Sequence, residues 1–251
     1  MSAAISLAAE PIFHVGSWEI TNSLLTTWVV MAVIFIAVAI FRSKRLKKFP
    51  KGAQNLIETI VDFLFKNMNE VTGSTKKTLT FFPLVAGIFG FIILVNWFGL
   101  IPGVGSIGLH EIHEGKAIFV PLFRAGTADI NTTLALAIVA VVATHIYGMK
   151  ELGVGKHIGK FLVNPFKHSP ILTGVGFLEM FGEISKIISF SFRLFGNIFA
   201  GEVLLIVVTG LVGYVAPVPF YFLELFVGFV QALVFAMLTL VFLTMSTAEQ
   251  H

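Results

Sequence analysis

Two long apolar stretches, residues 169–209 and 218–247, contain polar residues that could hold or move protons. These residues are Glu179, Glu183, Arg193, Asn197, Glu202, Glu224 and Gln231. Carboxylates within a membrane can take up and release protons, whereas arginine stays protonated under essentially all conditions. An arginine at the middle of a membrane helix costs roughly 2.5–3.5 kcal/mol on insertion scales. A chain that carries Arg193 at this cost needs either a partner charge or a function for it.

Helical spacing separates the polar residues of the first stretch into two directions. At about 100° per residue, Glu179, Glu183 and Asn197 share one broad face with Arg193. Glu202 falls about 180° away from Arg193 on the same wheel. The arginine therefore has no carboxylate within one helical turn on its own stretch, because the nearest in sequence are Glu183 and Glu202.

The second stretch carries Glu224 and Gln231 seven residues apart on one stripe. If the two stretches pair antiparallel with Gln231 level with Arg193, Glu202 and Glu224 come within about one turn of each other. We therefore expect an acidic region reached from outside, formed by Glu202 and Glu224. The other two carboxylates would form a second region reached from inside, with Arg193 between the two regions in depth.

A structural alternative applies to the inner carboxylates. Glu183 and Lys186 are three residues apart, a spacing at which opposite charges commonly pair on a helix. One or two glutamates would then simply neutralise Lys186 or Arg193 in a buried bridge. This alternative explains less well why the acids are divided between the two ends.

The composition predicts that these stretches belong to an all-α integral membrane protein. The 251 residues are 56% hydrophobic and only 12% charged, whereas soluble domains carry about 25% charged residues. The apolar runs reach the ~20 residues of a membrane helix, and the ~10-residue alternating strands of a barrel are absent. Most of the 17 basic residues lie in loops beside apolar runs, so they indicate topology and we expect no nucleic-acid partner. The absence of cysteine excludes disulfides and thiolate metal sites.

We expect one membrane domain with five membrane-spanning helices and one amphipathic surface helix. The spans are expected over residues 20–41, 81–101, 131–149, 169–209 and 218–247, the surface helix over 53–70, an external tail over 1–19 and an external loop over 102–130. Thirty helical residues measure ~45 Å, against ~30 Å of hydrocarbon. The last two helices must therefore be strongly tilted, and they pair as a hairpin through residues 210–219.

Single residues refine these spans. Pro83 fits the first turn of the second span, where its missing N–H costs little. Asn96 and Trp97 suit an interfacial anchor or a hydrogen bond between helices. Asp129 is a candidate N-cap for the third span. His145, near the inner end of that span, is more typical of a helix contact than of a relay.

The charge distribution predicts that the N-terminus lies outside and the C-terminus inside. Six basic residues follow the first span, between Arg42 and Lys51, and basic residues in short loops mark the cytoplasmic side. The external loop contains His110-Glu111-Ile112-His113-Glu114, which lacks the spacing of a zinc protease. We expect no metal and no cofactor.

The segment Ser191-Phe192-Arg193-Leu194-Phe195-Gly196-Asn197 resembles subunit a of the F-type ATP synthases, whose signature is Arg-Leu-x-x-Asn. The resemblance covers nearly the whole chain. It includes Asn96-Trp97 in an early span, Asp129-Ile130-Asn131 at the start of the next, and Gln231 in the last helix. In that family the residues corresponding to Glu202 and Glu224 vary, and both are glutamate here.

The resemblance implies a non-catalytic stator that conducts protons through two offset half-channels to and from a ring of c subunits. Each c subunit carries a membrane carboxylate, and proton flow turns the ring to drive ATP synthesis on other subunits. Arg193 would lower the pKa of passing ring carboxylates and repel protons that cross directly between the half-channels. The implied partners also include b-type subunits of the peripheral stalk. The implied location is the bacterial cytoplasmic (inner) membrane, or alternatively the mitochondrial inner membrane.

Two other functions are compatible with the same residues. A proton-coupled secondary transporter would use the buried arginine to bind an anionic substrate, and it would take up that substrate without other subunits. A purely structural assembly subunit would keep proton flux after substitution of Arg193, provided that the complex formed.

Overall fold

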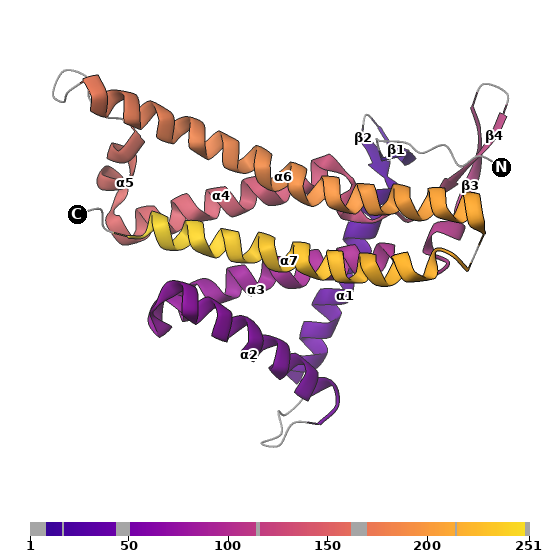
Figure 1. Ribbon diagram of the computed structural model, residues 1–251, viewed down its shortest axis with the longest axis horizontal. Helices are drawn as coiled ribbons and strands as arrows, with labels where there is room; N and C mark the ends of the chain where they lie inside the picture. Colours follow the sequence, from indigo (N-terminus) through magenta and orange to yellow (C-terminus); the bar gives the residue numbers. More distant parts are fainter. Residues whose placement is uncertain are drawn as a thin grey trace.

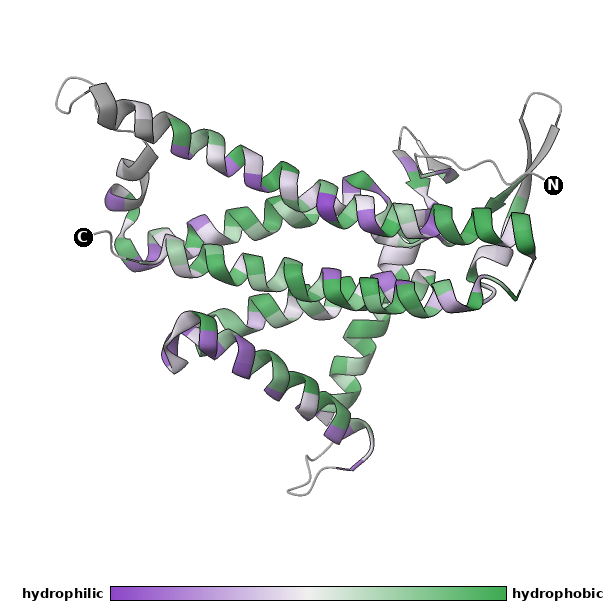
Figure 2. Ribbon diagram, viewed as in Figure 1, coloured by the Kyte–Doolittle hydropathy of each residue, from purple (hydrophilic) through white to green (hydrophobic). Residues whose placement is uncertain are grey.

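A computed structural model describes residues 9–16, 18–43, 51–113, 116–161, 170–213 and 215–248. Within these ranges five helices are long and apolar enough to cross a membrane, which confirms the expected all-α membrane class. Figure 2 shows apolar residues along most of their length. Residues 1–8 of the expected tail, most of the basic cluster after the first span, Glu114 and residue 169 lie outside the described ranges.

The five long helices are α1 (Asn22–Ser43), α3 (Thr75–Gly99), α4 (Ile130–Leu152), α6 (Pro170–Val212) and α7 (Val218–Ser246). Two further helices are α2 (Ala53–Thr72) and α5 (Val154–Phe161), and no helix was expected over the second of these. α3, α4, α6 and α7 run side by side, while α1 and α2 diverge from them (Figure 1).

α3 begins six residues before its expected start, so the placement of Pro83 in the first turn is wrong. Gly73 ends α2 at φ +61°, and its N–H donates to the Asn69 carbonyl, which lets a new helix begin at Thr75. Lys76 and Lys77 lie in its first turn and are not apolar. Hydropathy therefore located the apolar part of α3 but not the start of the helix. Pro83 lies in the interior of α3.

α6 and α7 are the longest helices, and they run antiparallel (Figure 1). The 43 residues of α6 measure about 64 Å at 1.5 Å per residue, twice the ~30 Å of membrane hydrocarbon. The rings of Phe190 on α6 and Phe235 on α7 have centroids 4.9 Å apart, and Gly201 on α6 lies against Glu224 on α7. These two contacts define the register of the pair.

The core lies where α7 packs against α3, α4 and α6. It includes Phe89, Ile92, Ala140, Leu194, Ala236 and Leu240, which are all buried. The second half of α2 joins this core through Leu64 and Met68. Its first half leaves Leu56 and Ile60 exposed, as expected of an amphipathic helix that also contacts a membrane surface or a partner.

Two short β-hairpins replace parts of the expected tail and external loop. β1 (Pro11–Val15) pairs with β2 (Trp18–Thr21), and β3 (Gly108–His113) pairs with β4 (Lys116–Pro121). No strand was expected in either segment. Strands of four to six residues are too short to stand out in a search for membrane-length apolar runs.

Candidate functional site

Arg193 lies on an exposed face of α6. One of its Nη atoms is 3.4 Å from the Ser189 hydroxyl one turn earlier, and no ion pair to Arg193 forms within the described part of the chain. Asn197 is also exposed, and its Nδ2 donates to the Arg193 carbonyl at 2.9 Å. The guanidinium therefore extends from the protein with no counter-charge on the described residues.

The opposite face of α6 fixes the position of this arginine. Leu194 is buried in the core, and the Ser191 hydroxyl lies 3.1 Å from the Thr133 hydroxyl of α4. On α7, the half-buried Gln231 falls between the two contacts that set the helix register. Gln231 and Arg193 therefore lie at the same level of the helix pair, which is the alignment assumed in pairing the two stretches.

Glu224 lies at the contact between α6 and α7. Its side chain is 6% exposed, and its carboxyl group rests on Gly201, where a Cβ atom would collide with it. Only glycine leaves this space. Because Glu202 follows Gly201 directly, the structure brings Glu202 and Glu224 to one end of the hairpin, as expected.

Glu202 is paired with Arg124, a partner that was not expected. Nε of Arg124 is 3.0 Å from both carboxylate oxygens, and the two side chains are 7% and 29% exposed, respectively. Arg124 lies in the segment between β4 and the short helix η2 (Gly126–Ala128). Arg124 belongs to the expected loop of residues 102–130, but this ion pair holds its side chain inside the bundle.

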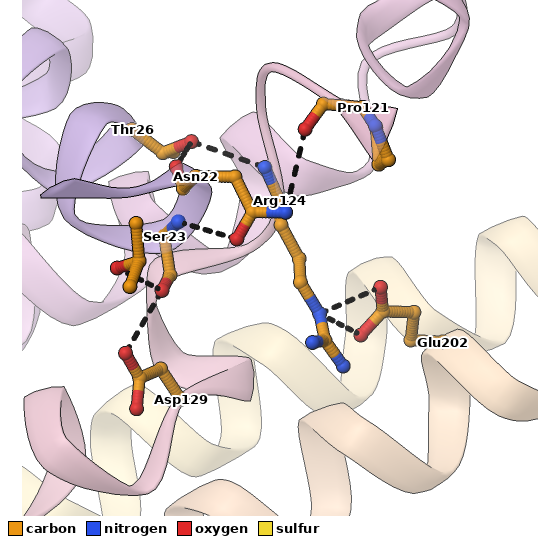
Figure 3. A network of polar contacts seen from close by, with 8 residues as sticks. Asn22, Ser23, Thr26, Pro121, Arg124, Asp129 and Glu202 are labelled. Atoms are coloured by element: carbon orange, nitrogen blue, oxygen red, sulfur yellow. Dashed lines mark hydrogen bonds and ion pairs between the residues drawn. The ribbon is translucent and has the colours of Figure 1, made fainter. Parts of the chain in front are cut away.

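A polar network surrounds Arg124 (Figure 3). The Thr26 hydroxyl on α1 accepts a hydrogen bond from the Arg124 backbone N–H at 3.2 Å. Ser23, also on α1, donates to Asp129 at 2.9 Å, and Asp129 accepts from the Asn131 N–H as the predicted N-cap of α4. The start of α1 is thus attached to the segment that carries Arg124.

An open cavity of about 440 Å³ lies beside the ion pair of Arg124 and Glu202. Its walls include Arg124, Glu202, Glu224, Asn96 and Tyr221. Glu202 and Glu224 therefore both border a space large enough for several water molecules.

Asn96 and Trp97 bond to α7, so the expectation of a hydrogen bond between helices is confirmed. Asn96 Nδ2 donates to the Gly228 carbonyl at 3.1 Å, and Trp97 Nε1 donates to the Leu225 carbonyl at 3.1 Å. Asn96 also accepts from the Thr127 hydroxyl at 2.5 Å. These bonds tie α3, α7 and η2 together beside Glu224.

Glu179 and Glu183 lie toward the other end of α6. Lys186 Nζ is 2.6 Å from Glu183 Oε1, so the bridge considered as a structural alternative is present. Glu183 Oε2 lies 3.5 Å from Nε2 of His145 on α4. Glu179 is half-buried one turn before Glu183. The structure thus places two acids at each end of the site, as the spacing predicted.

Sequence reasoning missed Arg124 as a member of the site. The available signal was weak: an isolated arginine between Phe123 and Ala125, just before the helix start at Asp129. Nothing in this pattern indicates that the side chain turns inward. His145 was noted, but its position beside Glu183 depends on how α4 and α6 pack.

The chain is similar to known proteins over most of its length. Residues 24–244 match the sequence profile of the family described as ATP synthase A chain. The chain is 35% identical over 226 residues to ATP synthase subunit a of Syntrophobacter fumaroxidans, which covers 90% of this chain and 84% of that protein. The identity to subunit a of Geobacter sp. strain M21 is 36%, over 92% of this chain and 89% of that protein. The identity to subunit a of Trichlorobacter lovleyi is 31%, over 98% of this chain and 96% of that protein.

Proposed function

Because the chain belongs to the ATP synthase A chain family, we propose that it is the proton-conducting stator of an F-type ATP synthase and faces a rotating ring of c subunits. The observation that carries this proposal is the exposed guanidinium of Arg193, which has no ion pair within the described part of the chain. A charge this costly in a membrane requires a partner. A ring carboxylate that is replaced as the ring turns supplies one.

The surface around Arg193 suits such a partner. Ser189, Gly196 and Ala200 are exposed on the same side of α6 and are all small. Small residues let another helix approach closely in a membrane. A ring helix can therefore bring its carboxylate near the guanidinium, whose charge favours the ionised form.

The two acidic regions serve as the two half-channels of this proposal. Protons enter through the cavity bordered by Glu202 and Glu224, reach the ring, and leave past Glu179 and Glu183. Arg193 separates the routes and repels a proton that would cross directly. A direct leak would dissipate about 2.3 kcal/mol per charge per 100 mV.

The proposal includes the setting of the protein. The chain carries no ATP chemistry, which belongs to other subunits, and b-type subunits of the peripheral stalk hold it. It lies in a bacterial cytoplasmic membrane, with the N-terminus outside and the C-terminus inside. The relatives in Syntrophobacter, Geobacter and Trichlorobacter support this location.

Replacing Arg193 tests the function. We expect Arg193→Ala to abolish ATP-driven proton pumping in vesicles that contain the assembled complex, because ring carboxylates would no longer be discharged. Arg42→Ala is the matched control, since Arg42 is an exposed arginine at the end of α1. It should pump like the unaltered complex. Normal coupled pumping by Arg193→Ala would contradict the proposal and favour a structural subunit.

A further inference from the structure

The inner end of the site contains a buried carboxylate oxygen that accepts no hydrogen bond. This atom is Glu183 Oε2, which is itself buried although the side chain as a whole is 19% exposed. It is the only such side-chain atom in the described part of the chain. An unsatisfied buried polar atom in a native structure calls for an explanation.

His145 lies directly opposite this oxygen. Nε2 of the imidazole is 3.5 Å from Oε2, beyond the 2.7–3.2 Å of a typical N–H···O hydrogen bond. The two groups come from different helices, α4 and α6, so their approach depends on helix packing. The gap is small enough for a proton on the imidazole to close it into a charge-assisted hydrogen bond.

Lys186 holds the carboxylate in this position. Its Nζ contacts Oε1 at 2.6 Å and lies 4.6 Å from the centroid of the Phe242 ring on α7. Lys186 therefore occupies one oxygen of Glu183 and turns the other toward His145. The structural bridge and a proton site coexist on one carboxylate.

We propose that His145 and Glu183 form a two-residue proton site that takes up and releases one proton at the inner end of this protein. When the site is filled, the proton resides on Nε2 and is donated to Oε2. When the site empties, that proton passes to water at the inner end, leaving a neutral imidazole beside the ionised carboxylate. Lys186 stays bonded to Oε1 in both states. The inference rests on the proposed function, which supplies the proton flux.

Other titratable residues also lie toward this end of the described helices: Glu179 on α6, Lys150 and Glu151 on α4, and Lys156, His157 and Lys160 on α5. α7 brings no charged side chain to this end within the described residues. Histidine is the side chain that ordinarily changes charge between about pH 5 and 8. The pair is therefore suited to capturing protons from a nearly neutral interior.

The test measures ATP-driven proton pumping by the assembled complex as a function of the inner pH. The inner pH is the pH on the side of the membrane that the His145 end of the protein faces, from which ATP-driven pumping takes up protons. We expect His145→Gln to pump normally at an inner pH of about 6 and roughly tenfold more slowly at about 8, because fewer protons are captured. This loss is smaller than the 10²–10⁴-fold loss on removing a general base completely, since Glu183 remains. His113→Gln on β3, at the opposite end of the molecule, is the matched control and should keep the unaltered profile.

A double variant separates a shared site from two independent effects. If the residues act as one site, His145→Gln combined with Glu183→Gln should pump no more slowly than the slower single variant. An unaltered pH profile in His145→Gln, or multiplied losses in the double variant, would overturn the inference. So would loss of assembly in both His145→Gln and His145→Asn, which would make the role of His145 structural. None of these results affects the Arg193 test, so failure of the pair and failure of the function are distinguishable.

Discussion

Two arginines in this membrane protein have opposite environments. Arg193 is exposed on α6 without an ion pair among the described residues, whereas Arg124 is buried against Glu202. A guanidinium that is buried and paired is costly to disturb, because removing one partner leaves the other uncompensated. A guanidinium that faces outward is free to meet successive charges. The same residue type therefore anchors Glu202 in one case and faces the proposed moving partner in the other.

The Arg124–Glu202 pair leads to a prediction about stability. Arg124→Gln should destabilise the protein by about 2–3 kcal/mol, below the 3–5 kcal/mol of a fully buried pair because Glu202 is 29% exposed. The measurement is the rate of limited proteolysis within residues 102–130 of the detergent-solubilised complex, which should rise. Adding Glu202→Gln should recover part of the loss, since the uncompensated carboxylate is then gone. A double variant less stable than Arg124→Gln would contradict the pairing.

At the scale of elements, the closeness of α6 and α7 decides where Glu224 lies. Gly201 has no side chain, so the Glu224 carboxyl fits between the helices at the wall of the outer cavity. Asn96 and Trp97 hold α7 from its other side through two backbone carbonyls. The position of one carboxylate thus depends on three helices, and a change on one helix moves a group on another.

A methyl group at Gly201 should therefore impair conduction without removing an ionisable residue. In Gly201→Ala the new Cβ displaces the Glu224 carboxyl, which is the movable end of a flexible side chain, so stability should change little. We expect proton flux to fall by about tenfold to hundredfold, as for other small displacements of a reacting group. The measurement is passive proton conduction in vesicles.

Gly210→Ala on the same helix provides the control for this substitution. A Cβ at Gly210 meets nothing within 4 Å, so its flux should match that of the unaltered protein. Equal flux in both alanine variants would show that the position of Glu224 is unimportant for conduction.

At the scale of the whole molecule, the exposed side of α6 is the proposed contact with the ring. Ser189 is exposed, whereas Ser191, two residues later, is 1% exposed and bonded to Thr133. The two side chains therefore lie on opposite faces of α6, one exposed and one buried. The chain contains no cysteine, so a single introduced thiol is unique within it.

Disulfide crosslinking therefore tests the orientation of α6. After oxidation, Ser189→Cys should form a crosslinked product with a ring subunit that carries one cysteine in its membrane helix, because both thiols face the same interface. Ser191→Cys should form little, because its side chain is buried against α4. Denaturing gel electrophoresis separates the products. Stronger crosslinking from residue 191 than from residue 189 would reverse the proposed face.

The sequence alone determined the class of the protein and the positions of its long helices. Hydropathy and charge are local properties, so runs of ~20 apolar residues locate membrane helices without knowledge of their packing. Helical spacing also brought Glu202 near Glu224, once the two helices were paired with Arg193 level with Gln231. The start of α3 and the two hairpins were missed, because a helix extends through polar residues and short strands carry little hydropathy signal.

Only the tertiary structure decided which charges from different helices and distant segments meet. Arg124 and Glu202 are 78 residues apart, and His145 and Glu183 lie on different helices, so neither pair follows from spacing along one helix. Their contacts depend on which helices are neighbours and on how each is rotated about its axis. The same holds for Gly201, whose missing side chain matters only because Glu224 packs against it. Side-chain pairing between distant segments is a property of packing, and packing is what the local pattern of residues leaves open.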